Sequence, residues 1–538
     1  RAYVIAEQND KAEAEFQTIL NVAPANISAL AALAELYLHE GQLDKAEGML
    51  GRAAKASGGD PQFRMQWAVA LARLHRYPAA QKALVGLAPP KARQERIAFH
   101  RLKASVASGL GNLPGAAAEM EKALALEPQD AGLILATAVA ELQSENWHRA
   151  ASLAQPLYSR TDDLQTGFVL LEAQLAMHQD SHKTLESLRA TQLKASEELA
   201  FRQRLAELLL AYGESAAAVE ELTRALELDP SRSESAYNLA LAEFKAGRLD
   251  DALASAQKCK ALADTADLED LLGDIQEARG DNLGAVRSYQ AAVTLAPNEE
   301  KYRLSFAVEF IRHQSFDAAR EVLKQAEELW PKSWRIQLAL GMAEYFAGTD
   351  EEASRLLLHA AELAPEPEIA LHYLGDIQMD QVSPPAAATA ARLCDYSDGH
   401  PLDGRLKYYC GALIFRRDYA SGDKTHADEI LSRLRSAANL LVKDGSPHCQ
   451  MGRVYQWLER WQEALRESET CVRMDPDSPD GHYRLAQIYK HLGEPERSKQ
   501  ELTLHKAASE RIVDQNARRD ETMKTFLYTI QKEARDHK

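Results

Sequence analysis

His178 and His182 are four residues apart, a spacing that places two imidazoles on one face of a helix, as in many zinc sites. Both residues, however, fall across a predicted turn between two helices, and Asp180 lies between them. Polar side chains at such turns are usually solvated. We therefore interpret this pair as turn residues, and the sequence predicts no metal site and no cofactor.

An acidic stretch near residue 400 has the residue types of a calcium-binding or catalytic loop. Its members are Asp395, Asp398, Gly399, His400 and Asp403. Their spacing does not match the ligand positions of a calcium loop. Because loops between repeats are usually polar, the sequence favours an ordinary connecting loop here.

Motifs that mark enzyme active sites do not occur in the sequence. It contains no phosphate-binding glycine loop, no G-x-S-x-G, no H-E-x-x-H and no paired C-x-x-C. We therefore predict a protein that is not an enzyme, with no catalytic residues and no small-molecule substrate. The alternative is an enzyme whose catalytic domain lies upstream of residue 1.

The five cysteines are too few, and odd in number, for a disulfide framework. Cys259, Cys394 and Cys471 occur where small apolar residues are expected in the repeat described below, which predicts packing roles. Cys410 and Cys449 lie in the first helices of neighbouring repeats. A bridge between these two stays open, as does the cellular compartment.

The composition predicts a helical, acidic protein with enough apolar residues to fold. Good helix formers dominate, 46% of the residues are hydrophobic, and the net charge is −17. This charge repels phosphate backbones, so nucleic acid is not an expected partner. The chain contains no run of about 18 apolar residues, so no membrane span is expected within it.

A period of 34 residues runs through the chain. The tetrapeptide Asp-Lys-Ala-Glu occurs at 10–13 and again at 44–47, and Pro297, Pro331 and Pro365 follow one another at offsets of 34. Each period has a Leu followed by a small residue, then a turn that usually contains Gly, then an Ala-rich second helix. Small residues let two helix backbones approach closely, and Gly supplies a positive φ at the turn.

These residues resemble the tetratricopeptide repeat (TPR) family, whose signature is the Leu-Gly/Ala pair, an aromatic residue three later, and Ala, an apolar residue, Ala and Pro. The resemblance covers nearly the whole chain. It implies an all-α fold, a right-handed superhelical α-solenoid of about fifteen helix-turn-helix hairpins. We expect TPR arrays over 1–379 and 445–506, and degenerate repeats with loop insertions over 380–444.

The two ends of the chain carry further expectations. A charged amphipathic segment, 507–538, is expected to form a C-terminal capping helix over the final hairpin, with docking of a partner as the alternative. Residue 1 is Arg and aligns with Glu35, so the first hairpin is incomplete at its start. We expect a segment upstream that decides between a cytoplasmic and an exported location, and the sequence predicts neither.

By resemblance to the family, the first helix of each hairpin lines the concave face and contacts extended peptides. In the C-terminal repeats, the polar and aromatic residues of these helices are Tyr408, Arg416, Arg453, Tyr483, Gln487 and Lys490. Basic and aromatic groups together suit an acidic or C-terminal carboxylate segment. The Lys and Asn set of the family's carboxylate clamp is not found here, and ordinary surface charge is the alternative interpretation.

The sequence thus predicts a protein–protein interaction scaffold or adaptor that binds partner proteins or extended peptides along its concave groove. The alternative is a self-assembling structural solenoid. Because a solenoid has two open ends, end-to-end stacking of copies would build a homopolymeric filament or tube. In both cases the expected partners are proteins, and in the second they are other copies of the chain.

Overall fold

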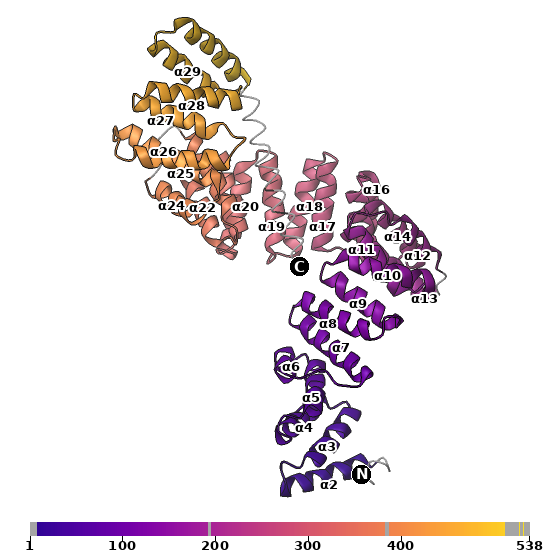
Figure 1. The fold of residues 1–538 in the computed structure, drawn as a ribbon. Coiled ribbons are helices and arrows are strands. Elements are labelled where there is room, and N and C mark those ends of the chain that lie inside the picture. Colours follow the sequence, from indigo (N-terminus) through magenta and orange to yellow (C-terminus); the bar gives the residue numbers. More distant parts are fainter. Residues whose placement is uncertain (1–7, 192–194, 382–386, 512–526, 528–530, 532–538) are drawn as a thin grey trace. The chain divides into compact units, whose positions relative to one another are not determined.

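The computed structural model describes residues 8–191, 195–381 and 387–511, together with Leu527 and Gln531. The fold is an all-α solenoid, as the 34-residue period predicted, and antiparallel helix pairs follow one another along the chain (Figure 1). Among the described helices, none is long and apolar enough to cross a membrane. The chain divides into two compact units, Arg1–Pro230 and Ser231–Lys538.

The first unit is built from hairpins in which the two helices pack along their lengths, such as α3 with α4 and α7 with α8. Its helices are α2 (Asn9–Val22), α3 (Ile27–His39), α4 (Leu43–Ala56), α5 (Pro61–Arg73), α6 (Tyr77–Leu84), α7 (Arg93–Gly109), α8 (Leu113–Leu126), α9 (Ala131–Gln143), α10 (Trp147–Thr161), α11 (Leu164–Ala176), α12 (His182–Ala190), α13 (Ala195–Ala211) and α14 (Ser215–Leu228).

The second unit continues the same pattern, and a further helix over 495–511 follows its last labelled element. Its helices are α15 (Ser233–Lys245), α16 (Leu249–Leu262), α17 (Ala266–Ala278), α18 (Asn282–Leu295), α19 (Glu300–Arg312), α20 (Phe316–Leu329), α21 (Trp334–Phe346), α22 (Asp350–Leu363), α23 (Glu368–Asp380), α24 (Ala387–Gly399), α25 (Gly404–Ser421), α26 (Ala427–Leu440), α27 (Ser446–Trp457), α28 (Trp461–Met474) and α29 (Pro479–His491).

Small residues at the helix crossings hold each hairpin together. In the hairpin of α21 and α22, a Cβ added to Gly341 would lie 3.0 Å from Cγ of Leu357. Ala353 and Ala360, at the small positions of α22, are fully buried. These residues let the two backbones approach, so that leucines fill the space beside the crossing.

A residue with a left-handed backbone conformation ends the first helix in most hairpins. Glycine takes this place at Gly41, Gly247 and Gly280, as predicted. In five of the described turns the same place is taken by a residue that is not glycine, although this costs roughly 1–2 kcal/mol. These residues are His75, Glu145, His178, Gln314 and Glu459.

The predicted packing roles of Cys394 and Cys471 are wrong. Cys394 of α24 is bonded to Cys410 of α25, and Cys449 of α27 is bonded to Cys471 of α28. Cys410 and Cys449 are therefore not bridged to each other. Each is bonded to a cysteine of a helix that adjoins its own in the chain, and the Cα–Cα distances are 5.0 Å for Cys394–Cys410 and 4.8 Å for Cys449–Cys471. Cys259 is a buried free thiol, as its packing role predicted.

Several expectations about the chain ends fall on residues that are not described. Residues 1–7 and 512–538, apart from Leu527 and Gln531, lie outside the described part of the chain. Leu527 and Gln531 are both buried. The incomplete first hairpin and the capping helix over 507–538 therefore stay predictions.

Candidate functional site

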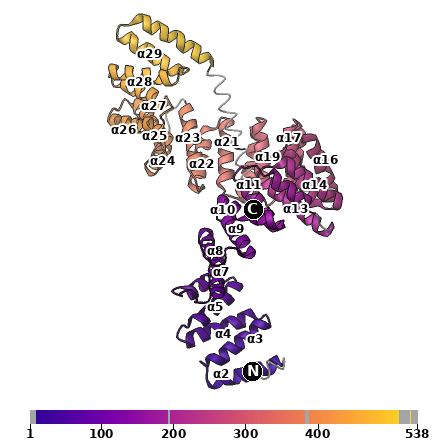
Figure 2. The same cartoon turned by 45° about the vertical axis from the view of Figure 1, so that its right-hand side comes forward.

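The predicted groove residues lie on three first helices of the second unit. Helix α23 contacts α25, α25 contacts α27 and α27 contacts α29, so these first helices lie side by side (Figure 2). We call their shared surface the first-helix layer. The predicted residues are Tyr408 and Arg416 on α25, Arg453 on α27, and Tyr483, Gln487 and Lys490 on α29.

Arg453 is a half-buried cation that forms no ion pair with a carboxylate of the described residues. Its Nη1 lies 3.5 Å from Oε1 of Gln450, its Cζ lies 5.7 Å from the ring centre of Phe415, and its Nε has no hydrogen-bond partner in the described part of the chain. Burial, and then the charge of Arg484, lower the pKa of Arg453. An anion beside this guanidinium would therefore be stabilised.

Two other guanidinium groups of the layer already have partners. Arg416 donates from both Nη atoms to the carbonyl oxygens of Gln378 and Gln381, at the C-terminal end of α23. Arg484 forms two hydrogen bonds of 2.9 Å with the carboxylate of Asp480, one turn earlier on α29. The sequence prediction did not include Arg484, although its spacing of four from Asp480 is the signal that could have found this pair.

Aromatic side chains border Arg453 and the end of the layer. Burial, and then the charge of Asp444, raise the pKa of Tyr408, so its hydroxyl stays neutral and can donate a hydrogen bond. Tyr483 is 44% exposed, and its ring centre lies 5.5 Å from that of His505. Lys490 is exposed and Gln487 is half-buried. The layer thus combines a neutral phenol, a guanidinium without an ion pair among the described residues, and exposed polar groups.

The acidic stretch near residue 400 was predicted to be a connecting loop, and this is wrong for its first part. Helix α24 continues to Gly399, and Asp398 near its end accepts a hydrogen bond of 2.7 Å from Nη1 of Arg433. Asp403 caps α25 by accepting a hydrogen bond from the backbone N–H of Leu406. It also lies 2.8 Å from Nε2 of His372. These aspartates therefore have structural roles.

His178 and His182, the pair considered as metal ligands, are both exposed to solvent, as predicted. His178 is exposed and has a left-handed backbone conformation in its turn. His182 is exposed at the start of α12, where its Nε2 lies 3.2 Å from the carboxylate of Glu186. The two side chains thus have separate surroundings.

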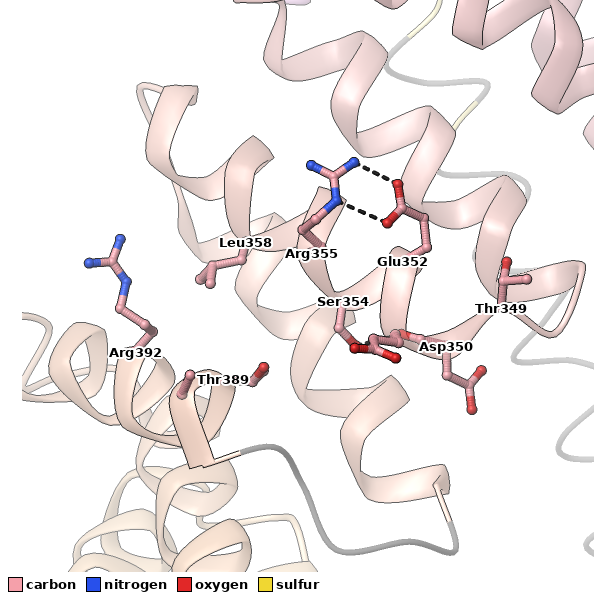
Figure 3. A pocket seen from close by; sticks show the side chains of 10 residues that line it. Thr349, Asp350, Glu352, Ser354, Arg355, Leu358, Thr389 and Arg392 are labelled. Atoms are coloured by element: carbon pink, nitrogen blue, oxygen red, sulfur yellow. Dashed lines mark hydrogen bonds and ion pairs between the residues drawn. The ribbon is translucent and has the colours of Figure 1, made fainter.

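Two open hollows lie on the second unit. One, of about 630 Å³, lies between α22 and α24; Figure 3 shows Arg355 turned toward Glu352, with Arg392 on the facing helix. Arg355 bonds Glu352 at 2.6 Å, and Arg392 pairs with Glu362. The other, of about 610 Å³, contains the His372–Asp403 pair. The arginines of the first hollow and the histidine of the second thus have carboxylate partners, whereas Arg453 forms no ion pair in the described part of the chain.

Comparisons with known proteins bear on the fold. Family models described as tetratricopeptide repeat match residues 3–65, 204–267 and 304–366. No curated protein matches the sequence. Similar solved structures include the Cut9–Hcn1 hetero-tetramer of the APC/C (16% identity, 98% of this chain and 94% of that chain, TM-score 0.31).

Two further solved structures cover a smaller part of this chain. One is a tetratricopeptide repeat protein from Parabacteroides merdae (13% identity, 53% of this chain and 99% of that chain, TM-score 0.36). Another is YrrB, a TPR protein with an unusual peptide-binding site (22% identity, 35% of this chain and 95% of that chain, TM-score 0.28).

Proposed function

Because this chain belongs to the tetratricopeptide repeat family, we propose that it is a scaffold whose first-helix layer binds an acidic peptide segment of a partner protein. The repeats support the general role of a protein-interaction scaffold, and the repeat is typically a non-catalytic fold. The chemical class of the segment and the place where it binds are our proposal.

The surroundings of Arg453 carry this proposal. A half-buried guanidinium without a carboxylate partner in the described residues is costly, because both its charge and its Nε–H are poorly compensated. A carboxylate of a bound peptide would accept hydrogen bonds from Arg453 and from the neutral hydroxyl of Tyr408. The exposed Tyr483 and Lys490 extend this surface along α29.

The proposal is tested with a fluorescein-labelled octapeptide of alternating Glu and Gly and the full-length chain. Fluorescence anisotropy is expected to show saturable binding that weakens as ionic strength rises. Replacing Arg453 by Gln should weaken binding about tenfold to a hundredfold, because a charge-assisted hydrogen bond contributes about 1.5–3 kcal/mol. A peptide of alternating Lys and Gly should not bind.

Arg466→Gln is the matched control. Arg466 is an exposed arginine on α28, the second helix of the same hairpin, and its loss should leave the affinity unchanged. Equal weakening by both substitutions would mean that the peptide reports overall charge, and the proposed site would be wrong. Light scattering of the same samples tests the self-assembly hypothesis, for which particle mass should grow with protein concentration.

A further inference from the structure

A carboxylate occupies an apolar position of the repeat in α19. Glu309 lies five residues before Gln314, the left-handed residue of its turn, and the equivalent residues of the neighbouring repeats are Ile275 and Ala343. All three are buried, and Glu309 is 2% exposed. Burial of a carboxylate is costly unless another group compensates the charge.

Two side chains lie against Glu309. Nε2 of His313 lies 3.3 Å from Oε1 of Glu309 and 3.0 Å from Oε2 of Glu277. One ligand atom from each of the three residues lies within 4.8 Å of the other two. In a tetrahedral zinc site, bonds of about 2.0–2.2 Å place the ligand atoms about 3.4 Å apart. The two measured distances are close to this value, so small movements would let all three atoms bind one ion.

An arginine already pairs with Glu277, but one oxygen of Glu309 lacks a hydrogen bond from the described residues. Nη2 of Arg312 lies 2.9 Å from Oε1 of Glu277, whereas Oε1 of Glu309 accepts no hydrogen bond from the described residues. Burial, and then the charge of Glu277, raise the pKa of Glu309 to about 8. Glu277 lies in the last turn of α17 and His313 follows the last residue of α19. Both helix ends carry partial negative charge, which further favours a cation.

We propose that Glu277, Glu309 and His313 bind one divalent transition-metal ion, with Zn²⁺ as the best match and a water molecule as the fourth ligand. One imidazole and two carboxylates are ligands that zinc accepts in proteins. Nδ1 of His313 lies 3.3 Å from the side-chain amide of Asn282. That amide offers both a donor and an acceptor, so it can accept the Nδ1–H of a metal-bound imidazole and hold the ring in place.

The ion would connect two first helices of neighbouring hairpins, because Glu277 belongs to α17 and Glu309 to α19. It would also remove the cost of the buried carboxylate. Metal binding should therefore stabilise the stack of hairpins in the second unit, as expected when a ligand binds the folded state only. No role in catalysis follows from this arrangement.

The test uses the full-length chain freed of metal by a chelator and titrated with ZnCl₂ in a calorimeter. We expect one tight site per chain, and its affinity should fall at least about 100-fold in Glu309→Gln and in His313→Gln. His182→Gln is the matched control, because His182 and Glu186 have the same spacing as Glu309 and His313 but are exposed. The control should bind zinc as the parent does.

Co²⁺ gives a second readout that does not depend on stability. A four-coordinate site should give the parent strong visible absorption that both variants lack. Glu309→Gln could fail to fold, which circular dichroism without metal would show. In that case the zinc affinity of His313→Gln still tests the proposal, because His313 is exposed and its replacement should not disturb folding. Zinc affinity that is the same in His313→Gln as in the parent would overturn the proposal. So would the absence of saturable zinc binding by the parent.

Discussion

Loss of the two disulfides is expected to destabilise the second unit and to leave the first unit nearly unchanged. The bridges Cys394–Cys410 and Cys449–Cys471 both lie between α24 and α28. In a solenoid each repeat contacts its neighbours, so the effect of a lost cross-link stays close to it. The appropriate perturbation is a pair of double variants, in which both cysteines of one bridge are replaced by Ala.

The expected magnitude follows from the loops that the bridges close. Their sequence separations are 16 and 22 residues. By the chain-entropy estimate, cross-links over loops of this size stabilise the folded state by about 3 kcal/mol each. With a urea dependence of about 1–3 kcal/mol per M, each double variant should unfold its repeats at a urea concentration roughly 1–3 M lower.

Alkylation under denaturing conditions without reductant tests the pairing itself. Mass spectrometry of the oxidised protein should find a modified thiol at Cys259 and none at the other four cysteines. Urea unfolding then measures the effect on stability, with the fluorescence of Trp457 and Trp461 as the signal. Both tryptophans pack against the hydrophobic core that contains Cys410. Four further alkylated thiols, or an unchanged urea midpoint after reduction, would refute the reasoning. Cys259→Ala is the control for the loss of a buried sulfur.

Two further substitutions test the packing and the electrostatics of single repeats. Gly341→Leu should destabilise the second unit by about 1–3 kcal/mol in urea unfolding, whereas Gly48→Leu, where an added Cβ meets nothing within 4 Å, should not. Burial alone would raise the pKa of Glu119, but hydrogen bonds from Lys122 and others lower it from 4.5 to about 2. This contributes about 3 kcal/mol of stability that is present above pH 4.5 and lost as the pH falls toward 2, so Glu119→Gln should destabilise the first unit at pH 7 and flatten its acid unfolding curve.

The hairpins could be predicted from sequence because the contacts that form them are close in the chain. A Leu-small pair, a turn and an Ala-rich helix recur within 34 residues, and each group packs on its own repeat or the next one. The pattern also tolerates exceptions. Glu145, Gln314 and Glu459 take the left-handed turn position without glycine, because packing of the two helices outweighs the local backbone cost.

The cysteine pairing could not be predicted from the same pattern. The period assigns Cys410 and Cys449 to first helices, but the direction of each side chain around its helix decides which neighbour it meets. Cys410 faces the preceding second helix and Cys449 faces the following one. A shift of one position along a helix turns a side chain by about 100° around the helix axis. The repeat alignment is not precise to one position, yet this angle decides which neighbouring helix a cysteine meets.

The two candidate sites differ in how far the repeat alignment marks their residues. Glu309 replaces an apolar residue at its position of the repeat. Six residues before the left-handed turn residue, α25, α27 and α29 have Arg416, Arg453 and Gln487. That position is apolar in α19 and α21 but acidic in α3, α11, α13 and α17. The alignment by turn position could therefore have found Glu309, but it does not single out the polar residues of the first-helix layer. It could not have shown that Arg416 caps α23 while Arg453 has no carboxylate partner in the described chain, because that depends on which groups each guanidinium reaches across to the next hairpin.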